Sequence, residues 1–352
     1  MVVLHRPASG GRGIARYSRD LAHALRAAGE PVRELAVRPW TVRVRGKELG
    51  GFLSIRLQGR LLPLVKRDVL HSTFHYAAHP RCDVATVHDL FLQTMAGPLG
   101  VASHELRRLG KGLARLARRR VRLVCVSEAT RRNLLAAEPS LREEATAVVH
   151  PGVREAFRPP PPAPRAAEEQ AERRVLCVAD LNPRKRVEWL LEAAVAVDDP
   201  RLRVVLVGSL RVQRPAWEGA RQRIDALAAR LGPRFEHHSD LDEAGLVRAY
   251  QDADLLVLPS VDEGFGFPPL EALACGTPVA VSDVPVFHET MGEQAAYFRD
   301  AGGLARVLRR VLSSPHPTPA QRQRRHSWVA RHHSWDGAAR ALRTLYAEVR
   351  RA

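Results

Sequence analysis

The chain of 352 residues contains only four cysteines and few aromatic side chains. The cysteines are far apart and form no CxxC pair, which argues against a zinc site and against a disulfide framework. Cys125 and Cys177 lie inside apolar runs, and we expect both to fill hydrophobic cores in a reducing compartment. Phenylalanine, tryptophan and tyrosine make up 5% of the chain, and no recognition motif for nucleic acid is present. The sequence therefore predicts a protein that does not bind nucleic acid.

Long apolar segments are missing as well. No run of about 18 apolar residues occurs, so no membrane-spanning helix is expected. The first residues, MVVLHRP, lead directly into a strand-like segment without the basic region and apolar core of a secretory signal. We therefore expect a cytoplasmic protein, with peripheral attachment to the inner face of the membrane as an alternative.

Lysine is rare, although the chain is strongly basic. Only four of the 55 basic residues are lysine, and the formal net charge is +17. A field of this sign attracts phosphates and anionic lipid. Residues 105–120 carry seven arginines and lysines around an apolar stripe made of Leu106, Leu109, Leu113 and Leu116. We favour an ordinary surface helix there, and contact with an anionic membrane is the alternative.

The order of apolar runs and polar turns predicts an α/β protein with two domains. Strand-like runs alternate with helical spacing until residues 158–174, where four consecutive prolines precede alanine, glutamate and arginine. The alternation resumes at residue 175. We predict an N-terminal domain over 1–157, a linker over 158–174, a C-terminal domain over 175–330 and a terminal helical segment over 331–352.

The stretch from residue 255 to 283 reads LLVLPSVDEGFGFPPLEALACGTPVAVSD. Its first four residues predict a strand buried on both faces, and its last apolar run predicts the next strand. Pro268 and Pro269 suit the first turn of a helix, and Gly276 suits the left-handed residue after its end. Strand, loop, helix and strand in this order form one unit of a doubly wound parallel sheet.

The loop-to-helix junction of that stretch has the chemistry of a ligand site. Gly264 and Gly266 leave the backbone accessible, and a helix N-terminus suits a phosphate. Glu263 and Glu271 flank the junction. Because a carboxylate repels phosphate and only accepts hydrogen bonds, we expect both glutamates to bind hydroxyl groups. A diphosphate between two polyhydroxylated groups describes a nucleotide sugar; an ordinary junction with a solvated glutamate is the alternative.

Three other segments add candidate residues near strand ends. Arg184 and Lys185 follow the strand predicted at 175–179, where they suit a diphosphate, with a solvated basic turn as the alternative. His88 follows a strand that ends at residue 87, at the edge where open α/β sheets bind ligands, although a histidine can also cap a strand. The segment ASGGRGI at 8–14, which includes Gly13, predicts a glycine loop before a helix over 15–28.

EGFGFPPLE at 263–271 resembles the E-x7-E element of retaining glycosyltransferases of family 4, the glycosyl transferases group 1, which have the GT-B fold. LVLPS before it, ALACGTPVAVSD after it, HDL at 88–90 and the basic turn at 183–186 are similar to segments of the same family. One departure is Asp180, because many members carry an arginine at this position. Arg184 is expected to substitute for it.

The resemblance implies two Rossmann-like, doubly wound domains that face a cleft, with the last helix crossing back onto the first domain. It implies catalytic roles for His88 and Glu263 at the transferred sugar, and a role for Glu271 at the ribose hydroxyls. No bound metal or other cofactor is implied. The donor-binding residues would be Gly13, Arg184, Lys185, Glu263, Gly264, Phe265, Gly266, Phe267, Leu270 and Glu271.

The implied reaction transfers a hexose-type sugar, mannose-like or related, from a GDP- or UDP-linked donor with retention at the anomeric carbon. The acceptor would be a hydroxyl of a glycan, a lipid-linked sugar or a small molecule. One alternative is an epimerase or hydrolase of sugar nucleotides with the same fold. Another is a basic binding protein with a vestigial site, although the intact pair of Glu263 and Glu271 argues against it.

Overall fold

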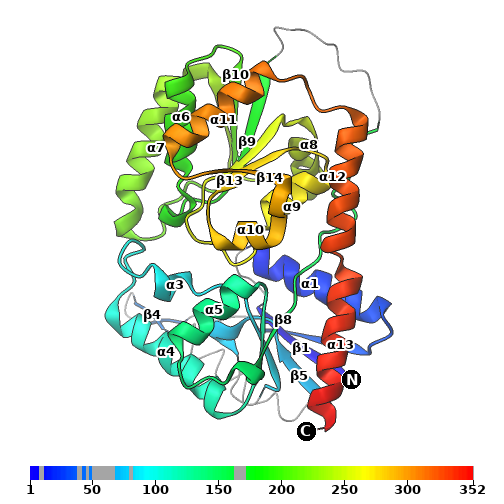
Figure 1. The fold of residues 1–352 in the computed structure, drawn as a ribbon. Helices are drawn as coiled ribbons and strands as arrows, with labels where there is room; N and C mark the ends of the chain where they lie inside the picture. Colours follow the sequence, from blue (N-terminus) through cyan, green and yellow to red (C-terminus); the bar gives the residue numbers. More distant parts are fainter. Residues whose placement is uncertain are drawn as a thin grey trace. The chain divides into compact units, whose positions relative to one another are not determined.

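The computed structural model describes residues 1–7, 12–37, 42–44, 47–49, 68–78, 82–161 and 172–351. They form two compact units (Figure 1). The first unit comprises Met1–Gln93, Ser103–Gly152 and His333–Ala352, and the second comprises Thr94–Ala102 and Val153–His332. The short segment 94–102 therefore groups with the second unit, although it lies within the range that the sequence assigned to the N-terminal domain.

The first unit is built on a parallel sheet of six strands in the order β2-β1-β5-β6-β7-β8. The chain passes from β1 to β2 on one side and then returns to β5 on the other side of β1. The topological switch point, where such sheets bind ligands, thus lies between β1 and β5. The strands are β1 (Val2–Pro7), β2 (Val32–Val37), β5 (Val69–Ser72), β6 (Val84–Val87), β7 (Arg122–Cys125) and β8 (Thr146–Val148).

Helices of the first unit pack against this sheet, and the last helix of the chain is one of them (Figure 1). Ser127 caps α5 because its side chain accepts a hydrogen bond from the Thr130 backbone N–H. The helical elements are α1 (Arg12–Ala27), η2 (His75–Ala77), α4 (Ser103–Arg118), α5 (Glu128–Ala137), η3 (Glu143–Ala145) and α13 (Trp335–Arg351). The short helix α3 (Phe91–Thr94) ends at the boundary, and β3 (Val42–Val44) pairs with β4 (Lys47–Leu49) in a separate antiparallel hairpin.

The second unit repeats the plan with a parallel sheet in the order β11-β10-β9-β12-β13-β14. The chain moves outward from β9 to β11 and then returns to β12 on the other side of β9. Its switch point lies between β9 and β12. The strands are β9 (Arg173–Val178), β10 (Leu202–Val207), β11 (Phe235–His238), β12 (Leu255–Leu258), β13 (Val279–Ser282) and β14 (Ala295–Phe298).

The helices of the second unit follow the strands in turn. Asp242 caps α8, since its side chain accepts a hydrogen bond from the Gly245 backbone N–H. Gly276 takes a left-handed conformation (φ 80°) just after α9, as predicted. The helical elements are η4 (Pro183–Lys185), α6 (Val187–Val197), η5 (Pro215–Trp217), α7 (Glu218–Leu231), η6 (Gly232–Arg234), α8 (Glu243–Asp252), α9 (Phe267–Ala274), α10 (Pro285–Met291), η7 (Gly292–Gln294), α11 (Ala301–Ser313) and α12 (Pro319–His332).

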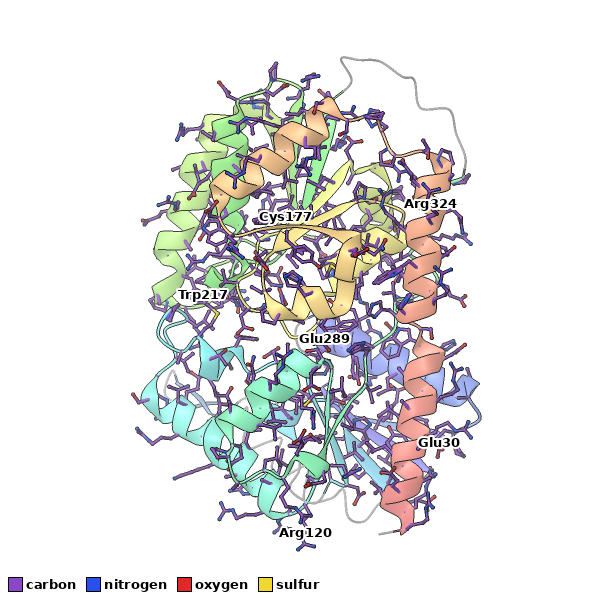
Figure 2. The ribbon with its side chains drawn as sticks, in the orientation of Figure 1. Glu30, Arg120, Cys177, Trp217, Glu289 and Arg324 are labelled. Atoms are coloured by element: carbon purple, nitrogen blue, oxygen red, sulfur yellow. The ribbon has the colours of Figure 1, made fainter. Side chains whose placement is uncertain are left out.

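Both sheets are lined by fully buried aliphatic side chains. The central strands β12 and β13 are buried along their whole length, which explains their unbroken apolar sequences. Cys125 and Cys177 are 0% exposed and unpaired, so the prediction that they fill the cores is confirmed; Figure 2 shows Cys177 inside the second unit. Within the described ranges, no helix combines the length and the apolar character that crossing a membrane requires.

Candidate active site

Two loops meet at the switch point of the second unit. The first follows β9 and contains η4, and the second connects β12 to α9. The backbone N–H of Val261 donates to the backbone oxygen of Arg184 at 2.9 Å, which ties the loops together. Because β9 and β12 are adjacent parallel strands, their carboxyl ends bring two segments about 80 residues apart in sequence to the same edge of the sheet.

The turn that carries the two predicted phosphate-binding cations is fixed by local hydrogen bonds. The Asn182 side chain accepts from the Arg184 backbone N–H at 3.1 Å, and Pro183 begins the 3-10 helix. Arg186 ends the helix in a left-handed conformation with φ at 47°, and α6 starts at the next residue. The turn therefore holds the backbone of Arg184 and Lys185 in one place between β9 and α6.

The start of α9 requires a glycine. Gly266 has φ at 93°, a conformation that L side chains rarely adopt. A Cβ atom at this position would lie 2.8 Å from Cε1 of Phe287 and 3.3 Å from Cε of Met291. The glycine is thus explained by backbone conformation and packing against α10, independently of any ligand.

Glu263 joins the two loops electrostatically. Its Oε2 lies 3.0 Å from Nη1 of Arg184, and its Oε1 accepts a hydrogen bond from Nζ of Lys185. Nη1 of Arg184 also donates to the backbone oxygen of Asp262 at 2.7 Å. The side chains of Glu263, Lys185 and Arg184 are only 9%, 14% and 13% exposed. The structure thus places the expected sugar-binding glutamate directly between the two expected phosphate-binding cations.

The charged groups of this cluster shift the pKa values of one another. Burial alone would raise the pKa of Glu263, but Arg184 and Lys185 outweigh burial and lower it to about 2. Burial and the neighbouring Arg184 lower the pKa of Lys185, and Glu263 opposes this shift. One carboxylate thus lies between two basic side chains, and the formal net charge of the three largely buried groups is +1. Such a cluster attracts a further anion.

Glu271 occupies a different environment inside α9. It is 2% exposed, and its Oε2 accepts a hydrogen bond from the hydroxyl of Tyr250 at 2.8 Å. Tyr250 lies in α8 and is itself fully buried. No local motif marks Tyr250 in the sequence, because it lies 21 residues before Glu271 and the contact depends on the packing of α8 against α9.

The other predicted donor-binding residues of this stretch are largely buried. Gly264, Phe265 and Leu270 are buried, and the ring of Phe265 packs edge-on against Phe267 at 5.2 Å between centroids. Their side chains support the loop from the inside. If they contact a donor, the backbone around Gly264 and Gly266 is the part of the loop suited to it.

Two acidic residues beside the site have structural partners of their own. Oδ1 of Asp180 accepts from the Ser209 backbone N–H at 2.7 Å, which links the ends of β9 and β10. Oδ2 of Asp262 accepts from the hydroxyl of Thr94 at 2.8 Å, and burial raises the pKa of Asp262. This contact attaches residue 94 to the second unit. Neither contact was predicted from the sequence.

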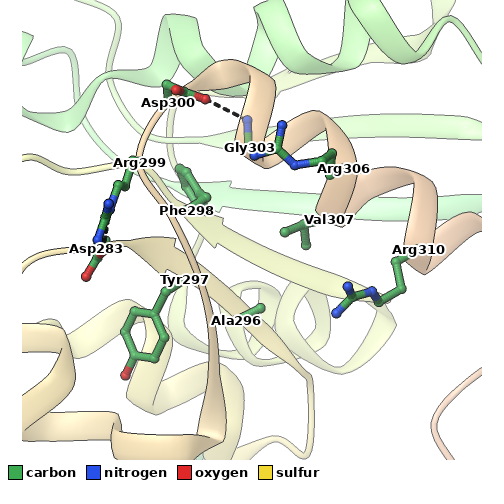
Figure 3. Close-up of a pocket in the computed structure, with 10 residues that line it drawn as sticks. All are labelled: Asp283, Ala296, Tyr297, Phe298, Arg299, Asp300, Gly303, Arg306, Val307 and Arg310. Atoms are coloured by element: carbon green, nitrogen blue, oxygen red, sulfur yellow. Dashed lines mark hydrogen bonds and ion pairs between the residues drawn. The ribbon is translucent and has the colours of Figure 1, made fainter.

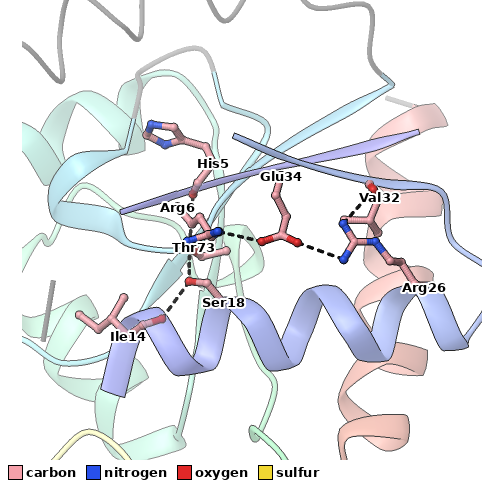
Figure 4. Close-up of polar contacts among 8 residues, drawn as sticks. All are labelled: His5, Arg6, Ile14, Ser18, Arg26, Val32, Glu34 and Thr73. Atoms are coloured by element: carbon pink, nitrogen blue, oxygen red, sulfur yellow. Dashed lines mark hydrogen bonds and ion pairs between the residues drawn. The ribbon is translucent and has the colours of Figure 1, made fainter. Parts of the chain in front are cut away.

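In the first unit, His88 follows β6 and is 8% exposed. Its Nε2 lies 2.8 Å from the backbone oxygen of Thr73, the residue after β5. Thr73 in turn contacts the first helix, since its hydroxyl lies 2.7 Å from that of Ser18, which also donates to the Ile14 carbonyl (Figure 4). His88 is therefore attached to the carboxyl end of β5, next to the switch point of this sheet.

The contact with Thr73 also sets the protonation of His88. A carbonyl only accepts hydrogen bonds, so Nε2 carries the proton. Burial lowers the pKa of His88 to about 4, and the bond to Thr73 opposes this only in part. The ring is neutral near pH 7, and its Nδ1 then carries a lone pair that can accept a hydrogen bond or a proton.

The expected glycine loop near the N-terminus differs from the structure at its end. The sequence predicts a helix that begins at residue 15, but α1 begins at Arg12, so Gly13 lies in its first turn. A Cβ atom at Gly13 would meet nothing within 4 Å, so packing does not require glycine there. Residues 8–11, the rest of the predicted loop, lie outside the described residues. His88 and Gly13 belong to the first unit, and the other predicted site residues belong to the second.

A groove of about 570 Å³ lies elsewhere in the second unit, beside β14 and α11 (Figure 3). Its polar lining includes Asp283, Arg299, Arg306 and Arg310, and none of the predicted site residues contributes to it. In the described part of the chain, no group of three or more histidine, cysteine or acidic side chains is arranged to hold a metal ion.

Comparison with known proteins shows that the chain is similar to glycosyltransferases. Residues 172–314 match the family described as glycosyl transferases group 1. The chain is 34% identical over 231 residues to a D-inositol 3-phosphate glycosyltransferase of Streptomyces bingchenggensis, a match that covers 59% of this chain and 49% of the relative. Over 63 residues it is 51% identical to the O-antigen chain mannosyltransferase RfbU of Salmonella typhimurium, covering 18% of this chain and 17% of the relative.

The fold extends over nearly the whole chain. The structure is similar to sucrose-phosphate synthase from Thermosynechococcus elongatus with a TM-score of 0.76 and 20% identity, covering 99% of this chain and 98% of that one. The two parallel six-stranded sheets with flanking helices are those of the GT-B fold, as predicted. By sequence, the chain spans about half the length of the inositol phosphate glycosyltransferases that it matches.

Proposed function

We propose that this chain, whose second unit belongs to the glycosyl transferases group 1, moves a hexose-type sugar from a nucleoside-diphosphate donor to a hydroxyl acceptor with retention at the anomeric carbon. The observation that carries the proposal is the largely buried cluster of Arg184, Lys185 and Glu263 at the switch point beside α9. Cations that suit a diphosphate and carboxylates that suit hydroxyl groups are held there within one pair of loops.

In this proposal the diphosphate lies against Arg184, Lys185 and the backbone at the start of α9, without a metal or other cofactor. Glu271 binds the ribose hydroxyls, and Glu263 binds the transferred sugar. His88, which is neutral with an unprotonated Nδ1, accepts a hydrogen bond from a sugar hydroxyl or the acceptor. The names of the relatives favour mannose or a related hexose and a glycan or phosphorylated small-molecule acceptor.

Calorimetry with bare nucleoside diphosphates tests the site. We expect the protein to bind UDP or GDP, and Lys185→Ala to weaken that binding by about 1.5–3 kcal/mol, because one charge-assisted contact is lost. Glu271→Gln should also weaken it, since a ribose contact is lost. Lys111→Ala in α4 removes the same charge at an exposed position and is the matched control. Binding of neither nucleotide by the wild type contradicts the proposal.

Turnover without an acceptor distinguishes transfer from the alternative chemistry. A transferase should release nucleoside diphosphate from GDP-mannose or a UDP-hexose slowly on its own and faster when acceptor candidates are added. Rapid acceptor-independent release, or conversion of one sugar nucleotide into another, would instead favour a hydrolase or an epimerase.

We also propose peripheral attachment to an anionic membrane through α4. The leucines Leu109, Leu113 and Leu116 are buried against the first unit, so the apolar stripe is already covered, while Arg107, Lys111 and Arg115 are exposed. Attachment would therefore be electrostatic and should weaken with salt. In sedimentation experiments the protein should bind phosphatidylglycerol vesicles. Changing Arg107, Lys111 and Arg115 together to glutamine should abolish this binding.

The matched control for that experiment changes Arg306, Arg309 and Arg310 in α11, which are also exposed, to glutamine. Because it removes the same number of charges, equal loss in both triple variants would attribute vesicle binding to net charge and not to α4.

A further inference from the structure

A chain of buried polar side chains connects α13 to the neighbourhood of His88 in the first unit. The hydroxyl of Tyr346 lies 2.6 Å from Nδ1 of His71, and Nε2 of His71 lies 2.8 Å from the hydroxyl of Thr86. The Thr86 hydroxyl lies 3.3 Å from that of Tyr17. Tyr17 packs edge-to-face against the His88 ring, with 4.6 Å between centroids and 89° between planes.

Every member of the chain is closed off from solvent and neutral. Tyr346, His71 and Thr86 are 0% exposed and Tyr17 is 3% exposed. Burial lowers the pKa of His71 to about 3, raises that of Tyr17 to about 12 and raises that of Tyr346 well above its usual value. A neutral imidazole has one N–H donor and one acceptor nitrogen, so the two neighbours of His71 use both. Removing either neighbour leaves a buried ring nitrogen without that partner.

The helix α13 contacts this chain at both of its ends. Near its start, Trp335 packs against Tyr17 with 5.6 Å between ring centroids, and near its end Tyr346 packs against His71. The start of the helix is held closely, because a Cβ atom at Gly152 would lie 2.2 Å from the Trp335 backbone nitrogen. The position of α13 therefore determines the positions of Tyr17 and His71 together.

His88 is held from two directions. Its Nε2 contacts the Thr73 carbonyl, and its ring rests on Tyr17. With Nε2 fixed, the direction in which Nδ1 points depends on the rotation of the ring, and Tyr17 limits that rotation. A buried network whose hydrogen bonds are all satisfied fixes one arrangement of its members.

We infer that Tyr346 and Thr86 are positioning residues, which orient His88 for transfer through His71 and Tyr17. The inference rests on the proposed role of His88 at the sugar. It assigns to the C-terminal helix a part in the reaction, although none of its residues is assigned to the donor or the acceptor. The chain acts through geometry, so it requires no proton transfer along its length.

The test compares Tyr346→Phe and Thr86→Val, which remove one hydroxyl each, with Thr86→Ser, which keeps the hydroxyl and removes only a methyl group. We expect kcat to fall about tenfold in Tyr346→Phe, which loses one buried hydrogen bond, and at least as far in Thr86→Val, which loses the contacts to both His71 and Tyr17. In Thr86→Ser kcat should stay near the wild-type value. Donor KM and calorimetric affinity for the bare nucleoside diphosphate should stay at the wild-type value. Tyr297→Phe is the control, since it removes a hydroxyl that bonds to the Gly292 carbonyl in the second unit.

A spectroscopic measurement separates this inference from the proposed function. The ring resonances of His88, assigned with His88→Ala, should shift in Tyr346→Phe and Thr86→Val and stay in place in Tyr297→Phe. Unchanged His88 resonances in both variants overturn the positioning role, whether or not transfer is observed. Wild-type kcat in both variants, or a loss in Thr86→Ser as large as in Thr86→Val, also overturns it. If the resonances shift while the wild type binds no nucleoside diphosphate, the proposed function fails and the structural coupling stands.

Discussion

The residue with the most consequences is Glu263. A glutamate alone in a loop would repel a diphosphate. Glu263, however, lies between Arg184 and Lys185 and is therefore the counter-ion of the two cations proposed to bind the diphosphate. A donor phosphate must therefore compete with Glu263 for them. When the phosphate takes over the cations, the Glu263 carboxylate becomes available to accept hydrogen bonds from the sugar.

Replacing Glu263 by glutamine tests this competition. Glutamine keeps the shape and removes the charge, so both cations should bind the bare nucleoside diphosphate as tightly as in the wild type or more tightly. Transfer from the full donor should nevertheless fall by about 100-fold, if Glu263 supplies roughly 2.7 kcal/mol at the transition state. Calorimetry beside transfer rates measures both. Weaker nucleotide binding in Glu263→Gln than in Glu271→Gln would show that the roles of the two glutamates are divided wrongly.

Tyr250 supports the other glutamate. Removing its hydroxyl in Tyr250→Phe leaves Oε2 of Glu271 buried without that donor, which should destabilise the second unit by about 1–3 kcal/mol. Nucleoside diphosphate affinity should fall as well, because Glu271 is no longer held in one orientation. Urea denaturation and calorimetry check the two effects. A change in stability with unchanged affinity would mean that Glu271 is only a structural residue of α9.

At the scale of elements, the junction between β12 and α9 depends on one glycine. Gly266→Ala introduces a Cβ 2.8 Å from the Phe287 ring at a φ of 93°, and should cost about 1–3 kcal/mol of stability. Gly219 in α7 is helical and exposed with no atom within 4 Å of a Cβ, so Gly219→Ala should instead stabilise the protein by about 0.5–1 kcal/mol. Urea denaturation of both variants should show opposite signs. An unaltered midpoint in Gly266→Ala would mean that α10 moves to accept the new methyl group.

The elements that the sequence predicts well are those with strong local signals. The strands β12 and β13 and the left-handed Gly276 follow from apolar runs and turn chemistry, which are properties of neighbouring residues. The predicted start of α1 was three residues too late, because glycines at 10, 11 and 13 suggested a loop, whereas the helix includes the last of them. The end of a helix next to glycine depends on tertiary packing, which cannot be inferred from the neighbouring residues alone.

The contacts across the site could not be predicted for the same reason. The pairing of Glu263 with Lys185 joins residues 78 apart, and the chain from Tyr346 to His71 joins residues 275 apart. The first contact arises because β9 and β12 are neighbours in their sheet, and the second arises because the last helix of the chain packs beside β5. The sequence indicates which side chains stand at strand ends, but their mutual partners are decided by tertiary packing.

At the scale of the whole molecule, the two units have different buried titratable groups. The first unit contains His71, His75 and His88, whose pKa values burial lowers to about 3, 3 and 4. The second unit contains Glu263, whose pKa is lowered to about 2 against burial by the adjacent cations. A buried histidine and a paired carboxylate respond to acid over different pH ranges, so the units should lose stability at different pH values.

On acidification the first unit should therefore unfold before the second. A histidine with a folded pKa near 4 or 3 and an unfolded pKa of 6.5 binds its proton in the unfolded state first, so stability falls once the pH drops below 6.5, by about 1.4 kcal/mol per pH unit for each neutral ring. Glu263 contributes stability above its unfolded pKa of 4.5, and this is lost only as the pH falls from 4.5 toward 2.

Amide hydrogen exchange measured by mass spectrometry between pH 7 and pH 3 tests this order of unfolding, because it reports the protection of each unit peptide by peptide. Residues 69–78 and 82–87 should lose protection between pH 6 and 4, while residues 255–282 keep it. His71→Asn should shift only the first loss to lower pH. Loss of protection in both units at one pH would show that they unfold as a single cooperative body in spite of their separate sheets.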